Sequence, residues 1–180
     1  MTITDIEYRA FLRTHLELLF YVGVQSNIIS DVIKFDQFID LDFSIKLKCR
    51  DFLLDNKKIL DDYITTNFDQ LTTDQISILT GFKKTITSDF VIFKCLTNNA
   101  VFMDTKDNKF YAVKALGDRF DEFFDRFPVL VQTTLLPFND QIVYDGFIKP
   151  TGVYLGAGIT STMKEDYKIA KKNNQILKTL

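Results

Sequence analysis

Hydrophobic and polar positions follow two different periods along this chain. As far as residue 84, apolar residues recur every three or four positions, the spacing that places them on one face of a helix. The segment 5–22 shows this best, because Phe11, His15, Leu19 and Val22 fall on one face. We expect four to five helices here, over the segments 5–22, 26–39, one or two within 41–67, and 74–84.

Beyond these helices the sequence becomes rich in aromatic and β-branched residues, which favour strands. Asn98-Asn99 suits a two-residue hairpin turn, since asparagine tolerates positive φ. Strands linked this closely predict an antiparallel meander. The expected strands are 90–96, 100–104, 110–116, 129–136, 142–148 and 153–155, with a Phe-rich helical excursion over 117–127.

The stretch 128–146, PVLVQTTLLPFNDQIVYDG, is the most strongly patterned segment of the chain. It reads as two strands joined at 137–141, and both faces of each strand are apolar. Such strands must be covered on both sides, either because the sheet curls into a small barrel or because helices pack on both faces. We favour the curled sheet, which makes this stretch its central hairpin.

Helices followed by a run of strands predict an α+β protein. We expect an N-terminal helical region packed on a curled, barrel-like antiparallel sheet of five to six strands, with a C-terminal helix. The chain reads as a single domain, 1–180, in which residues 1–85 are helical, residues 86–160 form the sheet and residues 161–180 form a terminal helical segment. Thr162-x-x-Glu165 is a capping box, which predicts the last helix over 162–177.

The hairpin also carries a family resemblance. Leu135-Leu136-Pro137-Phe138, a short turn, and then Ile142-Val143-Tyr144-Asp145-Gly146 resemble a hairpin found near the C-terminus of a family of uncharacterised bacterial proteins. Gly156 and Gly158, before the last helix, belong to the same resemblance. It implies a bacterial intracellular protein, and it brings no catalytic residue with it because the family has no assigned activity.

Composition narrows the function classes. The net charge of −2 argues against a general attraction to nucleic acid or anionic membranes, although a local basic patch stays open. The N-terminus is polar and acidic, and no apolar run approaches the roughly 20 residues of a membrane helix, so we expect a soluble cytoplasmic protein. The 18 Phe residues require a dense core or an exposed binding face, and the core is our first expectation.

Metal and nucleophilic chemistry find little support in the sequence. One histidine, His15, and two distant cysteines, Cys49 and Cys95, cannot supply a structural zinc site. Asp104, Asp107 and Asn108 share a turn but lack the spacing of a calcium loop. His15 lies on an apolar helix face, so we expect a core histidine. We therefore predict no catalytic residue, no metal ligand and no cofactor.

The candidate ligand-binding residues lie near the C-terminus. Gly156, Gly158, Thr160 and Ser161 form the pattern G-x-G-x-x-S between a strand and a helix, an arrangement used by phosphate-binding turns. Asp145 could present a carboxylate from the end of the preceding strand toward this loop. The alternatives are a simple sheet-to-helix turn for the loop and an ordinary bulge for Asp145-Gly146.

We interpret the chain first as a non-enzymatic module that binds a protein partner or a second copy of itself. The motivating feature is the Phe load, including the stripe Phe120, Phe123, Phe124 and Phe127, which fits either a lid on the core or a partner surface. The second hypothesis is a small-molecule or phosphate site, or an enzyme, at 156–161 and Asp145. A third uses the lysines of the last helix to bind nucleic acid, but we prefer a solvated face for Lys164, Lys168, Lys171 and Lys172.

Overall fold

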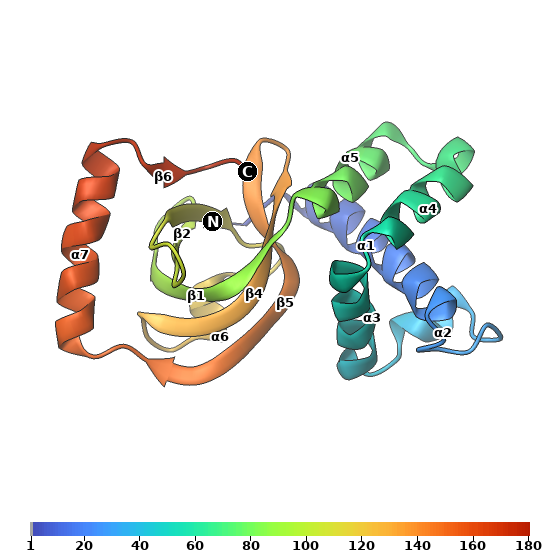
Figure 1. Cartoon of the computed structure of the whole chain (residues 1–180), viewed down its shortest axis with the longest axis horizontal. Coiled ribbons are helices and arrows are strands. Elements are labelled where there is room, and N and C mark those ends of the chain that lie inside the picture. Colours follow the sequence, from blue (N-terminus) through green and yellow to red (C-terminus); the bar gives the residue numbers. More distant parts are fainter. Residues whose placement is uncertain (1) are drawn as a thin grey trace. The chain divides into compact units, whose positions relative to one another are not determined.

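The computed structural model describes residues 2–180 (Figure 1). The chain is α+β: helices come first, a six-stranded mixed sheet follows, and a helix lies near the C-terminus. Its internal contacts divide it into two compact units. We call residues 6–83 the helical unit, and residues 2–5 together with 84–180 the sheet unit.

The helical unit forms five α-helices within its described residues, and local capping sets several of their ends. The Asp42 carboxylate accepts a hydrogen bond from the Ser44 N–H at 2.7 Å, and Thr72 and Gln75 form a reciprocal capping box. Asn56 occupies the C-cap position of the third helix and separates it from the fourth, so the segment 41–67 holds two helices. The elements are α1 (Asp5–Gln25), α2 (Phe35–Ile39), α3 (Phe43–Asp55), α4 (Lys58–Asn67) and α5 (Thr73–Gly81), with short 3₁₀ turns at Phe68–Gln70 and Phe82–Lys84.

The helix predicted over 26–39 is wrong for most of its length, since only Phe35–Ile39 is helical. Asn27 takes a left-handed conformation with φ of 56°, which ends α1 and turns the chain. The core of the unit holds the aromatic group Phe11, His15 and Phe82, whose ring centroids lie 4.6 to 6.0 Å apart. His15 is buried among these rings, as its position on the apolar face indicated.

In the sheet unit the strands close a hydrogen-bonded ring, which is not a true barrel. β1 pairs with β2 and β4, β5 pairs with β4 and β3, and β3 pairs back with β2. β6 adds to β3. The strands are β1 (Ile86–Cys95), β2 (Ala100–Asp104), β3 (Phe110–Lys114), β4 (Val129–Phe138), β5 (Gln141–Tyr154) and β6 (Ile176–Leu177).

The expectation of a purely antiparallel sheet needs one correction. The meander and the β4–β5 hairpin are antiparallel, but β3 runs parallel to both β5 and β6. The chain leaves β3 through the short helix α6 (Phe120–Phe123) and returns as a hairpin, so that the second strand of the hairpin reaches β3 in the same direction. This parallel pairing closes the ring.

The hairpin that dominates the sequence is central to the sheet, as predicted. Its turn is Asn139-Asp140, where both residues have positive φ, 47° and 56°, as a two-residue hairpin turn demands. β5 is longer than expected: the two strands predicted over 142–148 and 153–155 form one continuous strand that ends at Tyr154. Inside the ring, Phe120 packs edge-on against Phe102 at 5.1 Å and tilted against Tyr144 at 5.3 Å. Phe120 and Phe124 are buried, as a lid on the core requires, whereas Phe123 is exposed.

The last helix, α7 (Ala157–Lys172), lies alongside β1 and β2 (Figure 1). Met163, Tyr167 and Ala170 face the sheet and form with it a second apolar cluster, separate from the ring's interior. Its strand members are Val91, Phe93, Val101 and Phe110. Because neighbouring strand residues face opposite sides, the same strands supply Phe90 and Phe102 to the interior.

The predicted bounds of this helix, 162–177, are wrong at both ends. Gly156 occupies the N-cap position, so the helix begins five residues before the predicted capping box. At the other end Asn174 is left-handed, with φ of 54°, and the Gln175 N–H donates to the Ala170 carbonyl at 2.8 Å. This is a Schellman-type stop, and it releases the chain into β6. None of the helices in residues 2–180 combines the length and the apolar character needed to cross a bilayer.

Candidate functional site

The predicted glycine loop is the first turn of α7. Gly156 caps the helix, while Gly158, Thr160 and Ser161 lie within it. The Thr160 hydroxyl donates to the Gly156 carbonyl at 2.9 Å, an ordinary i to i−4 bond inside a helix. A Cβ added at Gly156 or Gly158 would meet no atom within 4 Å, so neither glycine is needed for a close approach of backbone.

Asp145 lies elsewhere. It is fully buried in β5, where its Oδ1 accepts a hydrogen bond from the Phe147 N–H at 3.0 Å. Gly146 beside it has φ of +90°, and the register of β4 against β5 shifts at this point. The carboxylate therefore takes part in a bulge. Along the β4–β5 ladder, Tyr144 stands opposite Leu135 and Tyr154 opposite Val129, so the ladder separates Asp145 from the start of α7.

A pocket of about 570 Å³ lies where α7 meets the C-terminal end of β1 and the segment before β4. We call it the lysine–aromatic pocket. Of the residues predicted to bind ligand, Thr160 lines it and the others do not. Its lining is Phe93, Lys94, Phe127, Pro128, Thr160, Lys164, Tyr167, Lys168 and Lys171.

Helical spacing explains why one side of α7 supplies most of this lining. Thr160, Lys164, Lys168 and Lys171 follow one another at intervals of four, four and three residues, which stacks them along one face. Tyr167 stands between them and turns toward the sheet. The same helix therefore uses its apolar edge to dock on the strands and its adjacent basic edge to line the pocket.

Lys94 brings a fourth ammonium group to the pocket from β1. Its Nζ lies 3.9 Å from the centroid of the Tyr167 ring and 5.1 Å from that of Phe93, within the range of cation–π contacts. The pKa of Lys94 is lowered, first because burial penalises its charge and then because Lys171 is a nearby like charge. Burial raises the pKa of Tyr167, which keeps its phenol neutral.

The positive charges that line this pocket are largely not offset by carboxylates in the described part of the same chain. Lys168 is paired with Glu165 at 2.8 Å at an exposed position. Among residues 2–180, no carboxylate forms a salt bridge with Lys94, Lys164 or Lys171. Lys94 is partly desolvated and feels the like charge of Lys171, and no carboxylate of the described residues forms a salt bridge that would offset this repulsion. The arrangement is therefore complementary to clustered negative charge.

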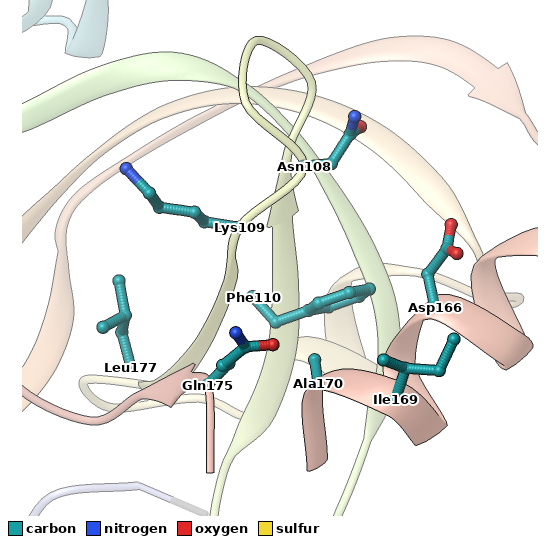
Figure 2. Close-up of a pocket in the computed structure, with 8 residues that line it drawn as sticks. All are labelled: Asn108, Lys109, Phe110, Asp166, Ile169, Ala170, Gln175 and Leu177. Carbon is teal, nitrogen blue, oxygen red and sulfur yellow. The ribbon is translucent and has the colours of Figure 1, made fainter. Parts of the chain in front are cut away.

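A different pocket, of about 450 Å³, lies on the other side of α7 against β3 and β6. Figure 2 shows the Phe110 ring extending toward Ala170 and Ile169 of α7, with Leu177 on the facing strand. Its polar rim consists of Asn108, Lys109, Asp166 and Gln175. Lys109 is already paired with Asp107 at 2.7 Å, so this pocket presents an apolar floor and little net charge.

The thiols and the histidine do not lie in either pocket. Burial raises the pKa of both the Cys49 and the Cys95 thiols to about 11, which disfavours the reactive thiolate. Within residues 2–180 the structure gathers no group of three His, Cys, Asp or Glu side chains that could hold a metal ion.

We compared the chain with protein-family models, with curated proteins and with solved structures, and none of the three comparisons gave a match. The candidate site therefore rests on its own geometry. The sequence predicted Thr160 as a ligand-binding candidate and showed the lysines of the last helix, but we expected those lysines to form a solvated face. Phe127 was expected only in a stripe that fits a lid or a partner surface. Lys94 and Tyr167 were not predicted, because only the docking of α7 on β1 brings them together.

Proposed function

We propose that this chain is a non-enzymatic binding module whose ligand carries phosphate or a similarly dense negative charge, held in the lysine–aromatic pocket. The observation that carries the proposal is the convergence of Lys94, Lys164 and Lys171 on one hollow without a carboxylate partner in the described chain. The Thr160 hydroxyl at the same wall adds a neutral hydrogen-bonding group.

We propose binding because the residue types that line the pocket suit it. Its groups are cations, aromatic rings, one proline and one hydroxyl. The cations can hold an anion, and the rings of Phe93 and Phe127 can contact a flat or apolar part of the same ligand. The proposal keeps the non-enzymatic role of the first hypothesis and takes the phosphate ligand from the second. It moves the ligand site from the glycine loop and Asp145 to the side of α7.

A titration of the chain with inorganic pyrophosphate, measured by isothermal titration calorimetry at 50 mM salt, tests this proposal. Three charge-assisted hydrogen bonds supply about 5 kcal/mol in total, so we expect a dissociation constant on the order of 0.1–1 mM. The double substitution K164Q/K171Q should weaken binding at least tenfold. Lys172 lies on the same helix outside the pocket, so K172Q is the matched control and should bind like the unmodified chain.

Two results would contradict the proposal. One is no measurable binding of pyrophosphate at 10 mM; the other is equal affinity for the double variant and for K172Q. Thermal unfolding of each variant shows whether its fold is retained. Both substituted lysines are exposed, so their replacement should shift Tm little.

A further inference from the structure

Resting on this proposed function, we propose further that the anion is the backbone of a single-stranded nucleic acid, laid along the side of α7. The first observation is that the site is elongated. A third pocket, of about 540 Å³, continues from the lysine–aromatic pocket and shares Tyr167 and Lys171 with it. We call it the β6 pocket; its lining is Leu96, Asn99, Val101, Ala112, Tyr167, Lys171, Asn174, Ile176, Leu177, Lys178 and Thr179.

The charges follow the same line. Lys164, Lys168 and Lys171 extend over seven residues of α7, which is about 10 Å at 1.5 Å per residue. Lys178 continues the series into the β6 pocket. A single phosphate would occupy only the lysine–aromatic pocket, whereas the longer row that continues to Lys178 matches a chain of phosphates, which in a nucleic-acid strand repeat every few ångströms.

Aromatic rings border the row of lysines, as strand-binding surfaces require. Phe127 is half-buried at the wall of the lysine–aromatic pocket and meets Phe124 edge-on at 6.4 Å. Phe123 in turn contacts the Phe124 ring, and Phe123 is 47% exposed. Bases stack on such rings without regard to sequence, and duplex bases cannot do so because they are already stacked. This favours a single strand over a duplex.

The β6 pocket adds groups that can contact base edges. Asn99 of the β1–β2 turn and Asn174 at the end of α7 offer amide donors and acceptors beside Lys171. An acidic peptide would use the lysines and the amides equally well, but it carries no bases to stack on the rings. The combination of cations, rings and amides along one line therefore fits a nucleic-acid strand best.

The fold limits where such a strand can lie. A three-stranded meander, a helix and a hairpin whose second strand pairs in parallel with β3 give the connectivity of the OB-fold, which binds oligonucleotides on the face of its second and third strands. Here α7 covers the outer face of β1, β2 and β3. The proposed strand therefore runs along the exposed edge of α7 and does not lie on that face.

Fluorescence anisotropy with 5′-labelled dT12 and U12 tests the inference, with a 12-base-pair duplex and inorganic polyphosphate as separate arms. We expect the single strands to bind at least tenfold more tightly than the duplex. If three or four phosphates are contacted, raising salt from 50 to 200 mM should weaken binding roughly 20- to 50-fold. K164Q/K171Q should flatten this salt dependence, and K172Q should leave it unchanged.

A separate variant, F127L, tests the role of the aromatic rings. F127L keeps an apolar side chain of similar bulk but removes the ring, and it should weaken single-strand binding about five- to tenfold, because the bases lose a ring on which to stack. The inference is overturned if pyrophosphate binds but neither single strand does, a result that leaves the proposed function standing. Equal affinity for duplex and single strand, or an unchanged F127L, also overturns it. If neither pyrophosphate nor any oligonucleotide binds, both proposals fail.

Discussion

The Lys94 ammonium group lies 3.9 Å from the centroid of the Tyr167 ring, and this contact joins the C-terminal end of β1 to α7. This contact is at once structural and electrostatic. The ring that docks the helix on the sheet is the same ring that holds the partly desolvated cation of the candidate site. The stability of the α7 docking and the affinity of the pocket should therefore depend on the same residue.

Replacement of Tyr167 tests the docking. Tyr167→Ala removes a ring that contacts Phe93 at 5.5 Å and Phe110 at 5.6 Å, so we expect the free energy of unfolding of the sheet unit to fall by about 3 kcal/mol. Tyr167→Phe keeps the ring and should cost well under 1 kcal/mol. Urea denaturation measures both. A loss below 1 kcal/mol for the alanine variant would mean that α7 is not held by this cluster.

Two glycines in helices should respond in opposite ways to alanine. A Cβ at Gly23 would lie 2.9 Å from the Cys49 Sγ and 3.0 Å from Ile29, so Gly23→Ala should destabilise the helical unit by about 1–3 kcal/mol. Gly158→Ala meets open space in α7 and should stabilise that helix by a few tenths of a kcal/mol or more. Thermal unfolding distinguishes the two.

Gly158→Ala also separates the two locations considered for the ligand. If the anion binds the side of α7, this variant should bind pyrophosphate with unchanged affinity. A phosphate-binding loop at 156–161 would require backbone contacts that a new methyl group disturbs. A large loss of affinity in Gly158→Ala would therefore return the site to the helix start.

A buried hydrogen bond should make Asp104 important for stability. Its Oδ1 accepts from the Ser88 hydroxyl at 2.8 Å and from the Lys106 N–H at 2.9 Å, and both Ser88 and Asp104 are buried. Asp104→Ala leaves these donors without their acceptor, so we expect a loss of about 2–3 kcal/mol. Asp118→Asn, at an exposed position, is the control and should change stability by less than 0.5 kcal/mol. Similar losses for the two variants would contradict this account.

The buried Cys49 thiol should make the free energy of unfolding depend on pH in the alkaline range. Cys49 has its pKa raised from 9.0 to about 11 by burial, so its protonated form is favoured in the folded state. The protonated thiol contributes its full stabilisation of the folded state below pH 9. This contribution is lost as pH rises toward 11, because between these two pH values the unfolded chain releases a proton that the folded chain retains. Unfolding free energies at pH 8 and pH 10.5 should differ less in Cys49→Ala than in the unmodified chain. An identical pH dependence would contradict the assignment.

Reaction with a disulfide reagent gives an independent measure of the same thiols. At pH 7.5 both cysteines should react far more slowly than a free thiol, and Cys95, which is only partly buried, should react before Cys49. Rapid labelling of Cys49 in the folded chain would show that it is accessible and not part of the core.

The sequence predicted those features that depend on neighbours along the chain. The period of the hydrophobic residues separated the helices from the strands, and the hairpin was predicted to turn within 137–141, where Asn139 and Asp140 take positive φ. Where local signals competed, prediction failed. Thr162-x-x-Glu165 resembles a capping box, yet Gly156 caps the helix, and the single left-handed residue Asn174 ends it early.

Features that depend on contacts between distant parts of the chain could not be predicted from local sequence patterns. The parallel pairing of Val113 with Ile142 depends on how the hairpin returns across α6, and no local pattern encodes it. The candidate site has the same origin. Lys94 and Lys171 are far apart in sequence, and they become neighbours only because Tyr167 docks α7 on β1. The lysine spacing on the last helix was visible, but the hollow beside it was not.

The central claim is that the side of α7 binds a phosphate-bearing ligand, and NMR of the lysine side chains during a pyrophosphate titration tests it most directly. We predict that the signals of Lys94, Lys164 and Lys171 shift together and saturate with one dissociation constant, while that of Lys172 stays in place. Signals that stay unchanged, or that drift equally for all lysines without saturation, would contradict the claim.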